Sequence, residues 1–168
     1  MDEEGFSGRD GRTTIFDYWS VDTLRRWNNN GQWNDEQLSD EEKKLQEFYR
    51  RLITLCNQEA ALADGLFYDL MPANYDNQEF DSTRLFAFLR GDKKDLLLMV
   101  ANFDNRMREC TIQIPEHAFT FFEIADTGKG MLKPLLHVEN KELPFSSDFP
   151  PRISLDSYSG EIYRISFS

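Results

Sequence analysis

Residues 84–103 read Arg84-Leu-Phe-Ala-Phe-Leu-Arg90, then Gly91-Asp-Lys-Lys-Asp95, then Leu96-Leu-Leu-Met-Val-Ala-Asn-Phe103. A strand that is apolar at successive positions is covered on both of its faces. A charged stretch that begins with glycine is typical of a turn between two strands. These residues therefore predict a central antiparallel hairpin that is covered on both sides.

The segments around this hairpin extend it into a larger antiparallel structure. After Gly65 the apolar residues alternate with a period of two, and strand-forming residues accumulate between short turn signals. The pattern predicts strands near 66–70, 83–90, 95–103, 108–114, 118–124, 131–138, 152–156 and 160–167. Short strands at this spacing are typical of a sandwich or barrel. We expect a mainly β protein, an antiparallel β-sandwich of the Greek-key type, with an N-terminal helical segment.

A long amphipathic helix precedes the predicted strands. Ser39-Asp-Glu-Glu42 is a capping box, with a serine at the N-cap and a glutamate three positions later. Apolar residues then recur at helical spacing from Leu45 to Ala60, and Gly65 supplies a stop signal. The sequence predicts a helix over 40–63 whose apolar stripe covers another surface.

Residues 1–38 contain all three tryptophans, Trp19, Trp27 and Trp33, together with many turn-forming residues. The segment predicts turns and caps, with at most a short helix from Val21 to Trp27. Its aromatic rings suit two roles, because a flat apolar face with a polar edge stacks on a sugar ring as readily as on a protein surface. The second role, in which the rings anchor the loop to a neighbouring surface, is favoured.

Composition excludes several classes of function. The chain has 168 residues and a net charge of −11, without a basic stripe to neutralise a phosphate backbone, so no nucleic-acid partner is expected. The longest apolar run, 96–101, is too short to cross a membrane. Cys56 and Cys110 have no companion metal-ligand pattern and are expected to be buried free thiols rather than a disulfide. The cellular compartment stays open.

Candidate catalytic groups are sparse. Asp10 and Asp17 are the acids in a polar loop, and turn or cap roles are favoured for both over a glycosidase carboxylate pair. His117 and His137 each lack the spaced partners of a metal site. We therefore expect no metal, no cofactor and no catalytic residue in this chain.

Three stretches resemble the alpha-amylase family, glycoside hydrolase family 13. Residues 8–19, Gly-Arg-Asp-Gly-Arg-Thr-Thr-Ile-Phe-Asp-Tyr-Trp, resemble the end of the family's catalytic domain. Residues 45–65 resemble its last barrel helix, with Cys56 and Ala60 in place of the usual arginine and proline. Residues 85–103 resemble the first hairpin of the C-terminal domain. The motifs follow the family's order, and beyond residue 105 the match is only topological.

The resemblance implies a division into 1–64, the last loop and helix of a (β/α)₈ barrel, and 65–168, a C-terminal β-sandwich. The family's three catalytic carboxylates would lie upstream, so the chain alone should be inactive. Its partners would be the upstream barrel of the same polypeptide and, in the full enzyme, an α-glucan such as starch or maltodextrin. The first motif would then lie at the active-site face of the barrel. There it would place Arg9, Asp10, Arg12 and Trp19 along the outer substrate cleft.

Two other classes of function remain open. A free-standing carbohydrate-binding sandwich would bind maltodextrin by itself through exposed tryptophans. A purely structural module would bind no sugar and would stabilise the barrel through the long helix. For the isolated chain we expect either self-association through residues 45–60 or packing of that helix on the chain's own sheet, because an apolar stripe without its barrel neighbours would be exposed.

Overall fold

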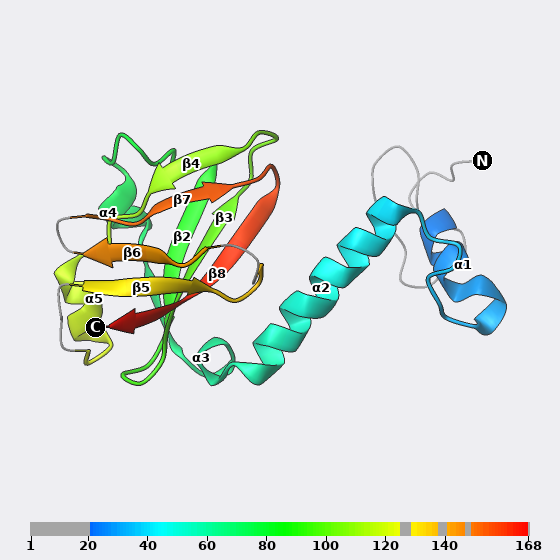
Figure 1. The fold of residues 1–168 in the computed structure, drawn as a ribbon, viewed down its shortest axis with the longest axis horizontal. Helices are drawn as coiled ribbons and strands as arrows, with labels where there is room; N and C mark the ends of the chain where they lie inside the picture. The colour runs from blue at the N-terminus through cyan, green and yellow to red at the C-terminus, as the bar shows by residue number, and fades with distance from the viewer. Residues whose placement is uncertain (1–20, 125–128, 138–140, 147–148, 168) are drawn as a thin grey trace. The chain divides into compact units, whose positions relative to one another are not determined.

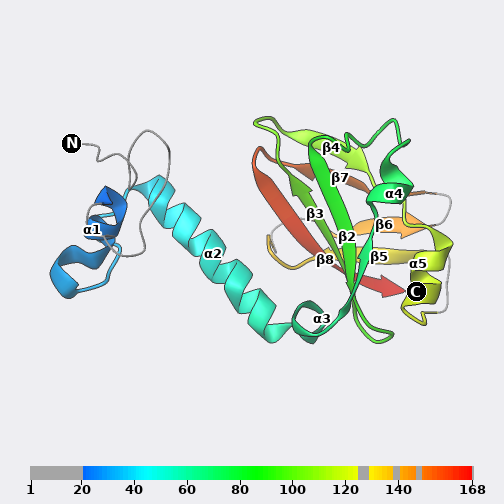
Figure 2. The ribbon, with the colours of Figure 1, turned by 180° about the vertical axis from the view of Figure 1, so that it is seen from behind.

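The computed structural model describes residues 21–124, 129–137, 141–146 and 149–167, and Figures 1 and 2 show their elements from two sides. The chain divides into two compact units, residues 1–50 and 51–168. The first unit contains helix α1 (Asp22–Asn28), a 3-10 turn η2 (Asn29–Gly31) and the start of helix α2 (Asp40–Gln58). The short helix predicted near residues 21–27 is confirmed.

Helix α2 begins where its sequence predicts. The backbone N–H of Glu42 donates to Ser39 Oγ at 3.3 Å, and the N–H of Ser39 donates to Glu42 Oε2 at 2.8 Å. These reciprocal bonds form the predicted capping box. The helix ends earlier than predicted, at Gln58, because Glu59 is extended with φ −93° and ψ 106°. A separate short helix, α3 (Ala60–Ala63), follows.

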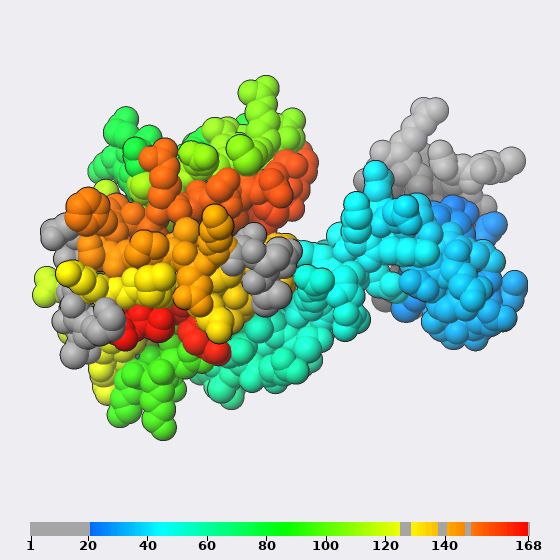
Figure 3. Space-filling model, in the orientation of Figure 1, coloured from blue at the N-terminus to red at the C-terminus, as the bar shows by residue number. Residues whose placement is uncertain are grey.

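The second unit is built on antiparallel strands. Its larger sheet has six strands in the order β1-β2-β3-β8-β5-β6, and a smaller sheet pairs β4 with β7. The bounds are β1 Leu66–Asp69, β2 Leu85–Gly91, β3 Leu96–Asn102, β4 Arg108–Thr111, β5 Lys129–Pro134, β6 Leu143–Ser146, β7 Arg152–Leu155 and β8 Ser159–Phe167. The atoms of β5 and β6, yellow to orange in Figure 3, form one surface of this unit.

One apolar core lies between the two sheets. Cys110 of β4 and Ile153 of β7 share it with Leu98 of β3 and Tyr163 of β8. Side chains from both sheets therefore fill one interior, which is the defining feature of a sandwich. The predicted antiparallel β-sandwich class, preceded by a long amphipathic helix, is confirmed.

A second, smaller apolar cluster covers the opposite face of the large sheet. Leu97 and Met99 of β3 point to this face, and they pack with Ala61 of α3 and with Leu52 and Leu55 of α2. The intervening residues of β3 point into the main core, because side chains alternate along a strand. The predicted hairpin with cover on both sides is thus confirmed, and the end of α2 together with α3 supplies part of that cover.

The strand predicted at 118–124 is wrong, because residues 116–121 form helix α5 (Glu116–Phe121). The run Ala118-Phe119-Thr120-Phe121-Phe122 is apolar at nearly every position, and periodicity alone does not distinguish a strand from a helix in such a run. Ala118 and Phe119 of the helix are buried, as is Phe122 just after it, whereas Phe121 is exposed. Glu116 supplies a favourable acid in the first turn.

The sequence pattern does not predict two short elements, β6 and α4. Strand β6 contains Pro144, which argues against a central strand, and it lies at an edge of the six-stranded sheet where a missing N–H is tolerated. Helix α4 (Met71–Asn74) is only one turn long and has a proline in its first turn. Across the described part of the chain, no helix combines the length and apolarity that spanning a membrane requires.

Candidate functional site

The four residues predicted to line a substrate cleft, Arg9, Asp10, Arg12 and Trp19, lie outside the described residues. Asp17, the other acid considered for catalysis, does too. The described continuation of the same segment, residues 21–42, carries the remaining polar and aromatic groups. This segment is the candidate site, and all of it belongs to the first unit.

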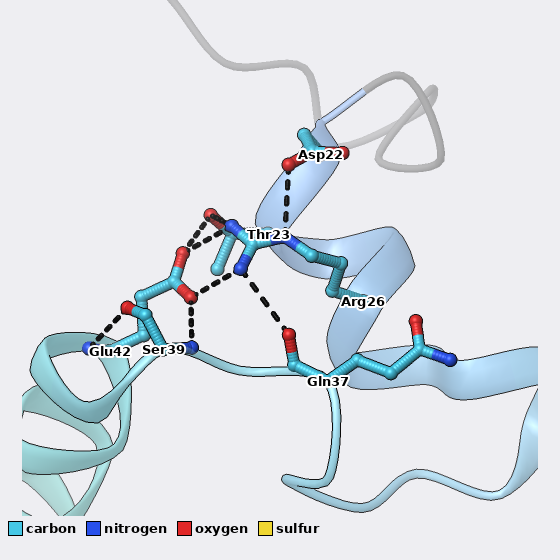
Figure 4. A network of polar contacts seen from close by, with 6 residues as sticks. All are labelled: Asp22, Thr23, Arg26, Gln37, Ser39 and Glu42. Atoms are coloured by element: carbon cyan, nitrogen blue, oxygen red, sulfur yellow. Dashed lines mark hydrogen bonds and ion pairs between the residues drawn. The ribbon is translucent and has the colours of Figure 1, made fainter.

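Arg26 is the centre of a polar network that joins α1 to the start of α2 (Figure 4). Its two terminal nitrogens bind both carboxylate oxygens of Glu42, at 2.6 and 2.5 Å. Its Nε donates to Asp22 Oδ2 at 2.9 Å, and Thr23 Oγ1 donates to Glu42 Oε1 at 2.8 Å. A guanidinium that engages one carboxylate with two nitrogens fixes orientation as well as distance.

The electrostatics of this network favour an architectural role. Hydrogen bonds from the Arg26 side chain and then from the Ser39 backbone lower the pKa of Glu42 to about 2. A carboxyl group with so low a pKa stays ionised near neutral pH and does not serve as a general acid. Glu42 therefore caps α2 and holds α1 against it.

A cluster of amide side chains fixes the loop between the two helices. Asn29 is buried, and its Nδ2 donates to Asn34 Oδ1 at 2.9 Å while its Oδ1 accepts from Gln37 Nε2 at 2.5 Å. Asn29 and Asn30 have φ values of 42° and 58°, in the left-handed region that asparagine tolerates better than most residues. The asparagine-rich sequence thus forms a turn held by its own side chains.

Two tryptophans lie on the described part of this loop. The ring centroids of Trp27 and Trp33 are 5.2 Å apart, and the ring planes meet at 79°. Trp33 is 51% exposed and Trp27 is 36% exposed. In this edge-to-face arrangement the edge of one ring packs against the face of the other, so the two rings do not form one flat surface. A sugar would stack on one ring rather than on a joint platform.

The two histidines lie in the second unit. His137 Nδ1 is 3.0 Å from Glu161 Oε2, and the ring of His117 packs against that of Tyr68 with centroids 5.6 Å apart. Among the residues that the structure describes, no group of three or more His, Cys, Asp or Glu side chains is arranged to hold a metal ion.

The cysteines are free thiols, and their burial differs. Cys110 is buried, as predicted, and burial raises its pKa to about 11. The prediction is wrong for Cys56, which is exposed. The helical spacing places Cys56 on the same side of α2 as Leu45, Tyr49 and Ile53, which are each more than half exposed. Leu52 and Leu55, on the adjoining side, pack against the sheet.

Comparison with known proteins identifies the fold. No family model matches the sequence, and no curated protein matches it. A solved Anoxybacillus alpha-amylase is 20% identical, with a TM-score of 0.52, over 75% of this chain and 23% of that one. The alpha-amylase of Geobacillus thermoleovorans, solved with acarbose, is 12% identical, with a TM-score of 0.53, over 74% of this chain and 23% of that one.

A third similar structure, AmyP in complex with maltose, is 16% identical, with a TM-score of 0.56, over 80% of this chain and 22% of that one. This chain therefore spans less than a quarter of the length of each of the three proteins. The predicted resemblance to the alpha-amylase family is confirmed at the level of the fold.

Proposed function

We propose that this chain is the C-terminal portion of an alpha-amylase family glycoside hydrolase, and that its own role is to support the catalytic barrel. One observation carries the proposal. This chain, a helix followed by an antiparallel sandwich, is similar to alpha-amylases over 74 to 80% of its own length at TM-scores of 0.52 to 0.56, and the match covers 22 to 23% of theirs. The sequence motifs support the same portion, because they resemble the last barrel helix and the first hairpin of the C-terminal domain.

The supporting role is favoured by where the apolar side chains lie. About half of the aromatic residues in 65–168 lie in or against the sandwich core, where their rings stabilise the fold. Helix α2 instead exposes Leu45, Tyr49 and Ile53. Burying such a face against a neighbouring domain is favourable by about 25 cal/mol per Å² of apolar surface. The barrel of the same polypeptide is the partner that we propose for it.

The activity of the whole enzyme is part of the proposal. It would hydrolyse or transfer α-glucosidic bonds of starch or maltodextrin by a retaining mechanism that uses two carboxylates. This chain would lack those carboxylates and would be inactive alone. Arg9, Asp10, Arg12 and Trp19 would contact the glucan at the edge of the cleft. Replacing Trp19 or Arg12 in the full enzyme should then raise KM for starch. Unchanged kinetics would show that these residues do not contact the glucan.

The first experiment is the mass of the native gene product, measured with an antibody against this chain on an extract of the source organism. We expect a band larger by at least a barrel, roughly 200 residues or more. The purified chain should also release no product from maltoheptaose. A band near 19.8 kDa, the mass of this chain, or measurable hydrolysis would reject the proposal.

A free-standing carbohydrate-binding module is the second candidate, favoured by the exposure of Trp33. All three tryptophans lie in the first 38 residues, so tryptophan fluorescence reports on that segment alone. A saturable change on addition of maltoheptaose would favour the binding module. No change would favour the supporting role.

A further inference from the structure

A row of three phenylalanine rings lies on β1 and β2 of the six-stranded sheet. The ring centroids of Phe67 and Phe88 are 5.3 Å apart, and those of Phe86 and Phe88 are 5.5 Å apart. Aromatic rings at these separations are in contact. The three side chains therefore form one continuous apolar strip that crosses from β1 to β2.

Strand alternation places this row on the sheet face opposite the main core. Phe86 and Phe88 alternate with the buried core residues of β2, which are Leu85, Ala87 and Leu89. Phe88 packs against the smaller cluster under α3, and Phe86, at the margin of the face, also contacts the main core. The row is thus continuous with the apolar surface on which α3 and the end of α2 pack.

The cover on this face is incomplete in the described part of the chain. Met99 of β3 and Ile162 of β8 are buried in the smaller cluster. By contrast, Phe67 is 50% exposed, and Phe103, the residue after β3, is 65% exposed. The N–H of Phe103 donates to the carbonyl of Arg84 at 2.8 Å, so the pairing of β2 with β3 continues and places Phe103 on the face of Met99. We call Phe67, Phe86, Phe88 and Phe103 the aromatic face.

The exposed area of the aromatic face is too small for an interface of its own. Full burial of an aromatic side chain removes roughly 150–250 Å² from water. Phe67 and Phe103 therefore offer on the order of 100 Å² each. A stable dimer buries about 800 Å² on each partner. The aromatic face fits a partner that is already held nearby better than a second copy that would bind through this surface alone.

Helix α2 leads to such a partner. Its sequence resembles the last helix of a (β/α)₈ barrel, in which the helices form an outer ring. Neighbouring helices pack at about 8–10 Å, which is about two strand spacings of a sheet. The end of α2, together with α3, covers β3 and β8. A helix beside α2 in the ring would therefore lie within reach of β1 and β2.

The charges on this sheet face favour the same side. Beyond β8, the next strand is β5, where Lys133 is exposed and lies opposite Arg164 in register. Burying an unpaired lysine under an apolar helix is costly, because the charge loses hydration. The aromatic face on the other side of α3 presents four uncharged rings. An apolar helix surface is thus accommodated over β1 and β2 rather than over β5.

We propose that the aromatic face binds a helix of the upstream barrel that neighbours α2 in the ring of helices. The apolar side of that helix would pack on Phe67 and Phe103. The identity of this partner rests on the proposed function, whereas the surface itself rests on the exposure and contacts of the four rings. The sandwich would then contact two barrel helices instead of one.

Thiol labelling with N-ethylmaleimide, followed at each peptide by mass spectrometry, compares this surface in the isolated chain and in the native full-length product. Cys56→Ser removes the exposed native thiol and is the background for all variants, whereas Cys110 is buried. Phe67→Cys and Phe103→Cys, made separately, each place a thiol on the aromatic face. Ser154→Cys is the matched control, because Ser154 is exposed on β7 of the smaller sheet.

We expect both thiols of the aromatic face to react readily in the isolated chain and at least about tenfold more slowly in the full-length product, because a covered thiol reacts only when the interface opens. The Ser154→Cys thiol should react at the same rate in both proteins. Equal rates for either thiol of the aromatic face would overturn the proposal. Slow labelling of the isolated chain that accelerates on dilution would also overturn it, because a second copy would then cover the face.

Two positions are used so that one destabilising substitution does not decide the result, and circular dichroism verifies the fold of each variant. The outcomes also separate this proposal from the proposed function. A native product near the mass of this chain would reject the enzyme fragment and, with it, the barrel as the partner. A product larger by a barrel, in which the aromatic-face thiols stay as reactive as in the isolated chain, would reject this proposal alone.

Discussion

Glu42 shows how much one side chain contributes to the first unit. Its carboxylate accepts hydrogen bonds from the Ser39 backbone, from Thr23 and from two nitrogens of Arg26. The same group thus caps α2, lies at the positive end of the helix dipole and fastens α1. Its lowered pKa follows from these donors, because each of them favours the charged form.

The pKa of Glu42 sets the pH dependence of this network. The pKa in the folded protein, about 2, lies below the ordinary glutamate value of 4.5, so the stabilisation is fully present above pH 4.5 and is lost as pH falls through about 2. We expect protection of the Ser39 and Glu42 amides from hydrogen exchange to persist from pH 7 to about 4.5. Below this range the protection should decline. Hydrogen exchange of the two amides, measured by NMR from pH 7 to about pH 2, tests this expectation.

Two variants control this measurement. Glu42→Gln should lower protection between pH 7 and about 4.5, because it removes the charge that Arg26 binds while keeping a side chain that can still accept a capping bond, and its difference from the wild type should shrink as pH falls towards 2. Glu41→Gln changes a neighbouring acid of the same helical turn that is exposed, and it should leave the two amides unchanged. Loss of protection already at pH 4.5 in the wild type would contradict the assigned pKa.

At the level of elements, Gly65 joins α3 to β1 at a point of close backbone approach. A Cβ atom added there would lie 2.2 Å from the carbonyl oxygen of Ala61 and 2.8 Å from the Cα and N of Gly91. All of these atoms belong to the backbone, so no side-chain rotation relieves the contact. The residue expected as a helix stop therefore also lets the chain enter the sheet beside β2.

Gly65→Ala should lower the free energy of unfolding by about 1–3 kcal/mol, the usual cost of inserting a methyl group into close-packed structure. Urea denaturation of the full chain, followed by circular dichroism, measures this change. Ala63→Ser, at an exposed position of α3, is the control and should change stability by no more than about 0.5 kcal/mol. A Gly65→Ala variant as stable as the wild type would mean that α3 shifts freely away from β1.

Some features of these elements are determined by neighbouring residues in the sequence, and others by contacts between distant residues. The capping box at Ser39 and the hairpin at 84–103 depend on adjacent residues, and both were predictable. The end of α2 was not, because Glu59 leaves the helix where it pairs with Arg164, which is distant in sequence. The period of two along β8 is local information as well, because it places Tyr163 on the same core-facing side of the strand as Ile165.

For the whole molecule, the two units differ in how they are held together. The second unit has an apolar core between its sheets and a second cluster under α3. The described part of the first unit depends more on polar side chains, with its main contacts at Arg26 and Asn29. We infer that the sandwich is the stable part of the chain and that the first unit needs a further surface, which the proposed barrel would supply.

This difference leads to a prediction about association. Leu45, Tyr49 and Ile53 are spaced by four residues along α2 and are each more than half exposed. In the isolated chain we expect this face to pair with another copy, because burying apolar side chains is favourable and nothing else in the described residues covers them. Sedimentation velocity should therefore show a weight-average mass that rises with protein concentration.

Two lysine substitutions test whether this face of α2, and not another side of the helix, mediates the association. Ile53→Lys should keep the chain monomeric, because a lysine within a paired apolar face loses part of its hydration. Thr54→Lys adds the same charge one position away, on the opposite side of α2, and should associate as the wild type does. A wild-type chain that stays monomeric up to about 1 mM, a concentration that detects only contacts stronger than about 4 kcal/mol, would argue against self-association. The exposed face would then require a partner of a different shape, as the barrel would be.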